Sequence, residues 1–427
     1  MLTAMDHERP LGWAHWRMSL SIAFASLLIG TAAFAQSLAP LAMRSSRRRG
    51  LPAIAAFISA VYLLLWATSA GAGVDLGDGG KVTLSGDFRA RLEQDFDSQR
   101  ADGRERDDRL RLRARVRLGI TWRATESLTV GARLRSGSDE SHQSPHVTVV
   151  DFDDNDTGDA DFNLDKWYLQ AKKDDRWAWV GRNSFPFWKA NEFFWDDDVT
   201  PAGVAGGFRR VLGESGDNRS LDFRLGYLTL PVGMQEFSGN LGGAQLVFAN
   251  KGFTLAAGLF DIDAASSDPD ATVLRNGNGL RDYRIWVVNV QAKRRAGGRP
   301  LALGVDFMHN DQSYGSSDPF GFANRDETDA YVASIVLGQT KARGDWLAGL
   351  YYAHIEALAV AASYAQDDWI RWGSAIEADS SDLEGFELRY ARSLGQGQNL
   401  VVRLYLVEAI TSRQDGNRFR LDYNLKF

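Results

Sequence analysis

The stretch that decides the fold is residues 107–122, DDRLRLRARVRLGITW. From residue 109 onward every second residue is apolar, so a strand would place all of its apolar side chains on one face. A helix would spread them around its circumference, because neighbouring residues lie about 100° apart. We therefore predict a β-strand whose two faces contact different environments. The basic face carries Arg109, Arg111, Arg113, Arg115 and Arg117.

The length of this strand indicates what the two environments are. Its fourteen residues, 109–122, span about 46 Å at roughly 3.3 Å each, more than the 17–20 Å of an ordinary soluble strand. Tilted by about 40°, such a strand crosses the roughly 25 Å apolar band of an outer-membrane barrel. An arginine facing lipid costs about 2–4 kcal/mol at the bilayer midplane, so the leucines face lipid and the arginines face a wet lumen. The alternative is an amphipathic strand of a soluble β-sandwich.

The first 72 residues differ from the remainder of the chain. They hold two apolar runs, Ser19–Ala35 and Leu51–Ala70, separated by a cluster of arginines. The second run has the basic start, apolar centre and Ala70-Gly71-Ala72 exit of a secretory signal peptide. We predict an upstream extension over residues 1–42, with translation beginning at Met43, a signal peptide over 43–72 and a mature barrel over 73–427. A membrane helix at either apolar run is the alternative.

Charge and composition narrow the class of partner. The chain has 49 basic and 55 acidic residues, and removing residues 1–72 takes away six and two, which leaves a net charge of −10. An acidic chain of this kind argues against nucleic acid as a partner. Without cysteine, the chain can form no disulfide, thiolate metal site or thiol redox centre. The 42 glycines and only 10 prolines suit many tight turns between uninterrupted strands.

Alternating segments recur along the rest of the chain and predict an all-β transmembrane antiparallel barrel of about 16 strands. An even number is typical of bacterial single-chain barrels. In the third strand, Arg133 and Arg135 fall on the inner face. The predicted strands are 81–96, 109–122, 128–136, 163–172, 177–182, 206–211, 220–228, 240–249, 253–261, 282–292, 300–310, 328–338, 345–354, 383–392, 399–409 and 418–427.

The last strand, 418–427 (RFRLDYNLKF), alternates like residues 109–122 and ends on the aromatic residue Phe427. Such a strand is typical of outer-membrane barrels and would pair with the first strand, leaving no open edge. We expect it to be the segment that the barrel assembly machinery contacts. Aromatic residues near strand ends would form an interfacial girdle: Trp122, Trp167, Trp177, Trp179, Trp286, Trp346 and Tyr405.

Residues 183–207, NSFPFWKANEFFWDDDVTPAGVAGG, form the least strand-like segment of the predicted barrel. Six aromatic residues stand before an aspartate triplet, and so apolar a loop must be buried, which in a barrel means folding into the lumen and narrowing it. We predict a constriction loop carrying Trp195, Asp196, Asp197 and Asp198. A packed plug with a simple turn cluster is the alternative. Residues 355–376 have helical spacing and predict a short helix in a later loop.

Three segments resemble the putative porins, a family of outer-membrane barrels: the arginine strand, the segment from Gly181 and the chain end from residue 355 to 427. The second resembles the motif G-R-x-x-x-P-F…W-D-D-D-x-x-P-x-G-x-A and is the most specific of the three. The resemblance covers most of 81–427 and none of residues 1–72. The chain departs from the family at KANEFF, residues 189–194, where the family has a shorter link. The resemblance implies a β-barrel pore and leaves its solute open.

We predict a passive channel in the outer membrane of a Gram-negative bacterium for small polar or anionic solutes. The seven inward arginines would oppose the aspartate triplet and set up a field across the lumen. A dedicated channel for an acidic oligo- or polysaccharide is the first alternative. The expected partners are outer-membrane lipid, lipopolysaccharide and the solutes themselves, with a homo-trimer or a monomer both open.

Catalysis and metal binding have little support in the sequence. A barrel hydrolase is the second alternative, but there is no G-x-S-x-G segment, and His309 and His354 are placed near strand ends. The acidic loop Asp151–Asp161 could chelate calcium, although its spacing is not that of an EF-hand. His142 and His146 form only a weak metal pair. We expect no cofactor, no metal and no catalytic residue.

Overall fold

The computed structural model describes residues 73–76, 81–154, 156–158, 160–213, 219–264, 281–373 and 378–427. The predicted upstream extension and signal peptide, residues 1–72, lie outside this range and stay predictions. None of the helices formed by the described residues is both long and apolar enough to cross a membrane.

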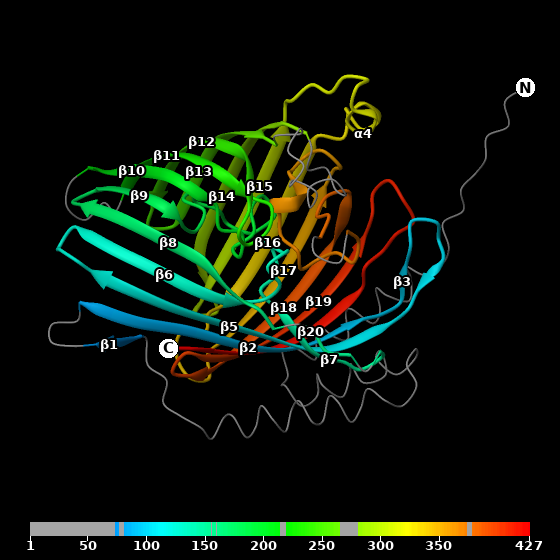
Figure 1. Cartoon of the computed structure of the whole chain (residues 1–427), viewed down its shortest axis with the longest axis horizontal. Coiled ribbons are helices and arrows are strands. Elements are labelled where there is room, and N and C mark those ends of the chain that lie inside the picture. The colour runs from blue at the N-terminus through cyan, green and yellow to red at the C-terminus, as the bar shows by residue number, and fades with distance from the viewer. Residues whose placement is uncertain are drawn as a thin grey trace, which may run out of the picture. The chain divides into compact units, whose positions relative to one another are not determined.

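Sixteen antiparallel strands close into a barrel, which confirms the predicted fold class and number (Figure 1). Each strand pairs with the strand before and after it in the chain. The barrel strands are β2 (Val82–Asp95), β5 (Arg109–Arg123), β6 (Leu128–Ser136), β8 (Phe162–Lys173), β9 (Arg176–Arg182), β10 (Ala202–Leu212), β11 (Arg219–Pro231), β12 (Phe237–Asn250), β13 (Phe253–Asp263), β14 (Tyr283–Ala296), β15 (Arg299–Asn310), β16 (Asp329–Gly338), β17 (Trp346–Ile355), β18 (Leu383–Gly395), β19 (Gln398–Glu408) and β20 (Arg418–Lys426).

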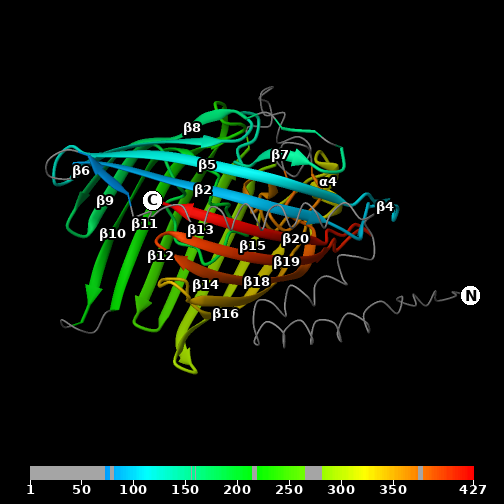
Figure 2. The same cartoon turned by 90° about the horizontal axis from the view of Figure 1, so that it is seen from below.

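The first and last barrel strands pair with each other. One edge of β2 pairs with β5, from Val82 opposite Trp122 to Asp95 opposite Arg109. Its other edge pairs with β20, where Asp95 stands opposite Arg418. Figure 2 shows β5, β2 and β20 side by side. The ring therefore satisfies the backbone groups that an open sheet edge would expose to lipid.

Two short strands pair with the parts of barrel strands that lie beyond the end of a shorter neighbouring strand. β1 (Val74–Leu76) pairs with the start of β2, beyond the end of β20. β7 (Val147–Asp151) pairs with residues 111–114 in the first half of β5, beyond the end of β6. A small hairpin of β3 (Ser98–Gln99) and β4 (Glu105–Arg106) stands in the loop after β2.

The connections at the two ends of the barrel differ in length. At one end five turns span two to four residues (124–127, 174–175, 251–252, 297–298 and 396–397), and the connections 213–218 and 339–345 span six and seven. At the other end the loops are long, and they include 137–161, 183–201, 311–328 and 356–382. Helix α4 (Pro319–Ala323) lies in the third of these loops. Short turns at one end and long loops at the other are typical of outer-membrane barrels.

The two faces of β5 differ as the sequence predicts. On its apolar face, Leu118, Ile120 and Trp122 are each about half exposed on the outside of the barrel. On its basic face Arg115 is buried, because its side chain points into a crowded interior. The alternation of residues 109–122 therefore separates the outside of the barrel from its inside.

The predicted aromatic girdle is only partly correct. Trp122, Trp167 and Trp286 are exposed on the outside, as the girdle requires. Trp179 and Tyr405 are instead buried in the interior core, with exposed fractions of 6% and 0%. Trp177 packs against the same core and lines an interior cavity. Each of the three falls on the inward-facing side of its strand, and position near a strand end does not reveal that side.

The predicted helix at residues 355–376 is also wrong. Among its described residues, 355–373, the only helical part is the 3₁₀ turn η2 (Ala362–Tyr364). The segment folds into the barrel instead, and Leu358, Ala359 and Val360 are completely buried. Its small apolar residues pack inside the barrel and do not line one face of a helix. The barrel therefore contains two inserted loops, 183–201 and 356–382.

Candidate pore and its constriction

The loop 183–201 joins β9 to β10 and is fixed to the wall formed by the next two strands, β11 and β12. The ring of Phe187 lies over two paired glycines, Gly226 of β11 and Gly243 of β12. A side chain at Gly243 would place its Cβ 2.7 Å from the Phe187 ring, so the ring fits only because the position is glycine. The side-chain amide of Gln245 also binds the backbone of Trp188, donating over 2.8 Å and accepting over 2.7 Å.

The aromatic residues of the loop stack with one another and with the second inserted loop. The Trp195 indole stacks on Phe185 with centroids 4.5 Å apart and on Tyr364 with centroids 5.3 Å apart. Its Nε1 donates to the Val199 carbonyl over 3.1 Å, and the side chain is 0% exposed. Trp195 therefore holds the two loops together and has no surface open to the lumen.

Backbone hydrogen bonds connect the same two loops. The amide of Asp196 donates to the Tyr364 carbonyl over 2.8 Å, and the amide of Gln366 donates to the Glu192 carbonyl over 3.0 Å. A third loop joins them, since His142 Nε2 lies 2.7 Å from the Ser363 carbonyl oxygen. Burial lowers the pKa of His142 to about 4, so its ring is neutral at pH 7 and donates through Nε2.

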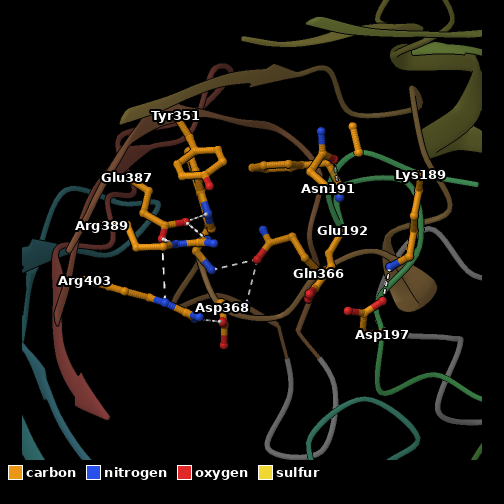
Figure 3. A pocket seen from close by; sticks show the side chains of 13 residues that line it. Lys189, Asn191, Glu192, Asp197, Tyr351, Gln366, Asp368, Glu387, Arg389 and Arg403 are labelled. Atoms are coloured by element: carbon orange, nitrogen blue, oxygen red, sulfur yellow. Dashed lines mark hydrogen bonds and ion pairs between the residues drawn. The ribbon is translucent and has the colours of Figure 1, made fainter. Parts of the chain in front are cut away.

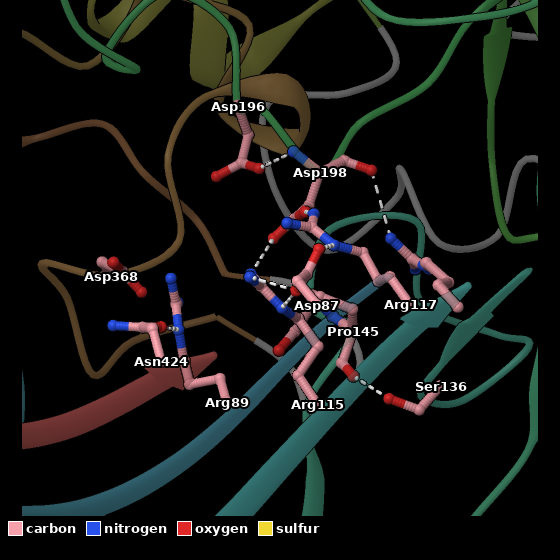
Figure 4. A network of polar contacts seen from close by, with 12 residues as sticks. Asp87, Arg89, Arg115, Arg117, Ser136, Pro145, Asp196, Asp198, Asp368 and Asn424 are labelled. Carbon is pink, nitrogen blue, oxygen red and sulfur yellow. Dashed lines mark hydrogen bonds and ion pairs between the residues drawn. The ribbon is translucent and has the colours of Figure 1, made fainter. Parts of the chain in front are cut away.

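The three aspartates after Trp195 have three different environments. Asp198 ion-pairs with Arg117 at 2.5 Å and with Arg115 at 3.6 Å (Figure 4). Burial would raise the pKa of Asp198, but these arginines outweigh it and hold the pKa below its usual range. Asp197 is exposed and binds Lys189 at 2.5 Å. Asp196 is buried, and burial together with the neighbouring Glu192 raises its pKa well above the usual value.

The seven predicted arginines all point into the barrel, and six of them are ion-paired to a carboxylate. Arg135 is the exception, because it donates to the carbonyls of Ser141, His142 and Asp198. The wall is therefore a lattice of opposite charges and not a bare basic surface. The pairs are Arg109 with Asp95 (3.1 Å), Arg111 with Glu93, Arg113 with Glu93 (3.5 Å), Arg115 and Arg117 with Asp87 (2.8 and 2.7 Å), and Arg133 with Asp165 (2.5 Å).

The acidic partners come from the seam between β2 and β20 and from the second loop. Across the seam Arg91 binds Asp422 at 2.7 Å, and Glu93 binds Arg420 at 2.7 Å. Asp368 of the loop 356–382 adds a further carboxylate beside Arg91, at 3.5 Å. Alternation in residues 81–96 and 418–427 places these side chains on the inner face, but sequence reasoning did not identify them as partners of the arginine strand.

A cavity of about 220 Å³ lies between the loop 183–201 and the opposite wall (Figure 3). The loop contributes Lys189, Asn191, Glu192 and Asp197, of which only Asp197 was predicted as a site residue. The wall contributes residues that sequence reasoning missed. They are Tyr351 of β17, Glu387 and Arg389 of β18, and Arg403 of β19. The second inserted loop, 356–382, contributes Asp368, which sequence reasoning also missed.

The charges around this cavity are paired in the same way as those of the arginine lattice. Glu387 binds Arg389 at 2.6 Å, and Arg403 binds Asp368 at 3.0 Å. Arg389 also lies over the ring of Tyr351, 4.5 Å from its centroid. None of the seven predicted arginines lines this cavity. The available signal was weak, because an Arg or Glu on an inner face occurs in several strands.

The loop carboxyl at this cavity has an unusual pKa. Burial, with the nearby Asp197 as the next cause, raises the pKa of Glu192 to about 8, so this carboxyl holds a proton at neutral pH. Among the described residues, no group of histidines and carboxylates is arranged to hold a metal ion. The constriction therefore offers charge, hydrogen bonding and aromatic surface to a passing solute.

Comparison with known proteins gives one family. Residues 98–228 match the family described as putative porin, a range that includes the arginine strand and the constriction loop. The matched segment and the closed 16-stranded barrel together support an outer-membrane porin channel. No curated protein matches the chain.

Several solved structures are similar to the chain at low sequence identity. The high-pH structure of OprB from Pseudomonas putida is 12% identical, with a TM-score of 0.51 over 84% of this chain and 99% of that chain. A triple mutant of the Rhodopseudomonas blastica porin is 13% identical, with a TM-score of 0.46 over 81% and 100%. OccAB4 from Acinetobacter baumannii is 10% identical, with a TM-score of 0.44 over 81% and 98%. The likeness to OprB concerns the barrel fold.

Proposed function

We propose that this porin passes small polar solutes by passive diffusion and discriminates only weakly between anions and cations. The observation that carries the proposal is the pairing of charges around the 220 Å³ cavity. Lys189 is paired with Asp197, Arg389 with Glu387 and Arg403 with Asp368. A paired wall creates a field across the lumen that orients polar solutes, but it adds little net charge that would exclude one sign of ion.

The predicted site residues take separate roles in this proposal. The arginines from Arg109 to Arg117, with Arg133 and Arg135, form the charged inner wall on the side of β5 and β6. Asp198 fixes the constriction loop to that wall, whereas Trp195 and Asp196 hold the loop in shape. Asp197 is the member of the triplet that meets the solute, because its side chain is 66% exposed.

The proposed setting is the outer membrane of a Gram-negative bacterium, with lipid and lipopolysaccharide around the barrel. The half-exposed apolar residues on the outside of β5 support this setting. The last strand, β20, would be the contact of the barrel assembly machinery, and the assembled form would be a homo-trimer. Residues 43–72 would be removed on export, and mass spectrometry of the isolated protein would then find Gly73 at its N-terminus.

Planar-bilayer recording tests the channel proposal. We expect stable conductance in potassium chloride, with similar permeability for K⁺ and Cl⁻. Replacing Arg389→Gln should shift the reversal potential toward cation preference, because Glu387 then has one arginine fewer to balance it. Arg294→Gln is the matched control, since Arg294 is exposed at a turn of the barrel and should leave selectivity unchanged.

Two results would favour the other readings of the sequence. Strong anion preference with block by oligouronates would support a dedicated channel for acidic saccharides. In that case Arg111→Gln and Arg113→Gln should also abolish the preference, because both arginines belong to the inner wall. Absence of conductance together with turnover of an ester substrate would instead support a barrel hydrolase.

A further inference from the structure

A second interior cavity, of about 340 Å³, lies on the short-turn side of the constriction loop. Its wall is formed by neighbouring residues of β8, β9 and β11, and its roof by residues 183–186 of the loop. Lys172 stands opposite Trp177, Trp177 stands opposite Gly207, and Gly207 stands opposite Arg224. One row across four adjacent strands therefore presents the Lys172 ammonium, the Trp177 indole, a glycine without a side chain (Gly207) and the Arg224 guanidinium. In Figure 1, β8 to β11 follow one another around the barrel wall.

The glycine in this row positions the indole. A Cβ at Gly207 would lie 3.0 Å from Nε1 and 3.1 Å from Cε2 of Trp177, so the indole lies across the place where a side chain would stand. An aromatic ring placed over a glycine of the neighbouring strand is held against the sheet. Trp177 consequently offers a fixed, flat surface to the cavity. Trp179, two residues further along β9, completes the aromatic part of the lining.

The charged groups of the lining are both positive. Within the described part of the chain, the Lys172 ammonium forms no ion pair with a carboxylate. The Lys172 side chain is exposed. Arg224 donates to the Pro186 carbonyl over 3.0 Å and lies 3.5 Å from Asp222, but its Nε has no partner among the described residues. Asp222 itself does not line the cavity. A ligand here meets two cations, a flat indole and the amide of Gln170.

We propose that this cavity binds solutes that join a carboxylate to a flat apolar face, such as aryl carboxylates or uronic acids. The apolar face would stack on Trp177, while the carboxylate accepts hydrogen bonds from Lys172 and Arg224. With neighbouring strands about 4.8 Å apart, Lys172 and Arg224 start roughly 14 Å apart, and both long side chains reach toward the indole between them. The site is separate from the 220 Å³ cavity and shares no residue with it.

This inference depends on the proposed channel, since a solute reaches the cavity only through an open lumen. Isothermal titration calorimetry on the whole chain in detergent can test binding without conductance. Benzoate carries both features, whereas acetate carries the charge alone and benzyl alcohol the ring alone. We expect benzoate to bind about tenfold or more tightly than either partial probe, because the charge-assisted hydrogen bonds and the stacking act together. Glucuronate, compared with benzoate, distinguishes a uronic acid from an aryl carboxylate as the preferred solute.

Two variants test whether Lys172 and Trp177 account for the affinity for benzoate. Lys172→Gln should weaken benzoate binding about tenfold and bring it near that of benzyl alcohol, and Trp177→Ala should bring it near that of acetate. Lys173→Gln is the matched control, because Lys173 is the next residue on β8 and points to the other face of the sheet.

The outcomes separate this inference from the channel proposal. Equal affinity for the three probes, or unchanged benzoate binding in Lys172→Gln, would overturn the site even if the protein conducts potassium chloride. Absence of conductance in the unsubstituted protein would instead contradict the channel. Lys172 is exposed at a strand end, so its replacement tests the site even if Trp177→Ala does not fold.

Discussion

Asp198 shows how one residue connects an inserted loop to the barrel wall. Its carboxylate lies between Arg117 and Arg115, both on the inner face of β5, and its side chain is only 16% exposed. Removing one partner of a buried ion pair leaves the other charge without compensation, which is usually more costly than the pair is favourable. The same argument does not apply to Asp197, which water reaches.

Replacing Asp198→Asn should lower the free energy of unfolding by about 3 kcal/mol, because Arg115 and Arg117 lose part of their compensation in a buried site. The measurement is urea unfolding of the protein in detergent, followed by the mobility shift of the folded barrel in electrophoresis. Asp197→Asn is the matched control and should cost less than about 1 kcal/mol, as exposed ion pairs do. Equal losses in the two variants would contradict the assigned role of Asp198.

Glu192 should make the stability of the protein depend on pH. Its pKa in the folded protein is about 8, above the usual value of 4.5, so the folded protein binds this proton more tightly than the unfolded chain does. The stabilising contribution is complete below about pH 4.5 and is lost as the pH rises through 8. Thermal unfolding temperature should therefore fall between pH 6 and pH 9. Glu192→Gln should remove this decrease, and a decrease that persists in the variant would assign it to another group.

At the scale of elements, the loops 183–201 and 356–382 behave as one packed layer inside the barrel. Their aromatic residues stack on each other, and their backbones exchange hydrogen bonds. The layer is attached to β11 and β12 by the ring of Phe187 over Gly226 and Gly243. A fixed constriction follows from this attachment, because the loop cannot shift without withdrawing the ring.

Replacing Gly243→Ala should displace the constriction loop. The new Cβ would lie 2.7 Å from Phe187 and 2.8 Å from Phe260, closer than atoms in a packed core approach each other. Overpacking of this kind costs about 1–3 kcal/mol. Single-channel recording should show altered conductance or increased current noise. Gly242→Ala is the matched control, since a Cβ at Gly242 meets no atom within 4 Å. The prediction fails if both variants conduct like the original protein.

At the scale of the whole molecule, the seam between β2 and β20 holds the barrel closed. Its inner face carries a series of ion pairs, among them Arg91 with Asp422 and Glu93 with Arg420. Glu93 is completely buried and also binds Arg111 and Arg113 of β5. One carboxylate thus connects the last strand, the first strand and the arginine strand.

Replacing Glu93→Gln should open this seam more readily, because three arginines would share no carboxylate at that position. We expect a loss of roughly 3 kcal/mol and a lower temperature for the conversion of the folded barrel to the unfolded chain in detergent. Glu105→Gln in the β3–β4 hairpin is the control, since that side chain is exposed and should change little. Unchanged stability in Glu93→Gln would mean that the ion pairs of Glu93 do not hold the seam closed.

Much of the fold was predictable from local pattern. The alternation in residues 109–122 depends only on neighbouring residues, so it identifies a strand, its two faces and, through its length, a membrane barrel. The number of strands and the pairing of the last strand with the first follow from the same pattern repeated along the chain. The inserted loop 183–201 was predictable because so many aromatic residues outside a strand must be buried somewhere.

The candidate site was less predictable, and the reason is distance along the chain. The sequence by itself determined which side chains point inward, because a strand imposes this residue by residue. Only the tertiary structure decided which of them meet: Arg91 and Asp422 are 331 residues apart, and the cavity joins Lys189 to Arg403. A row of arginines therefore predicts a basic wall, whereas closure of the barrel brings carboxylates from β2, β20 and two loops against it and neutralises its charge.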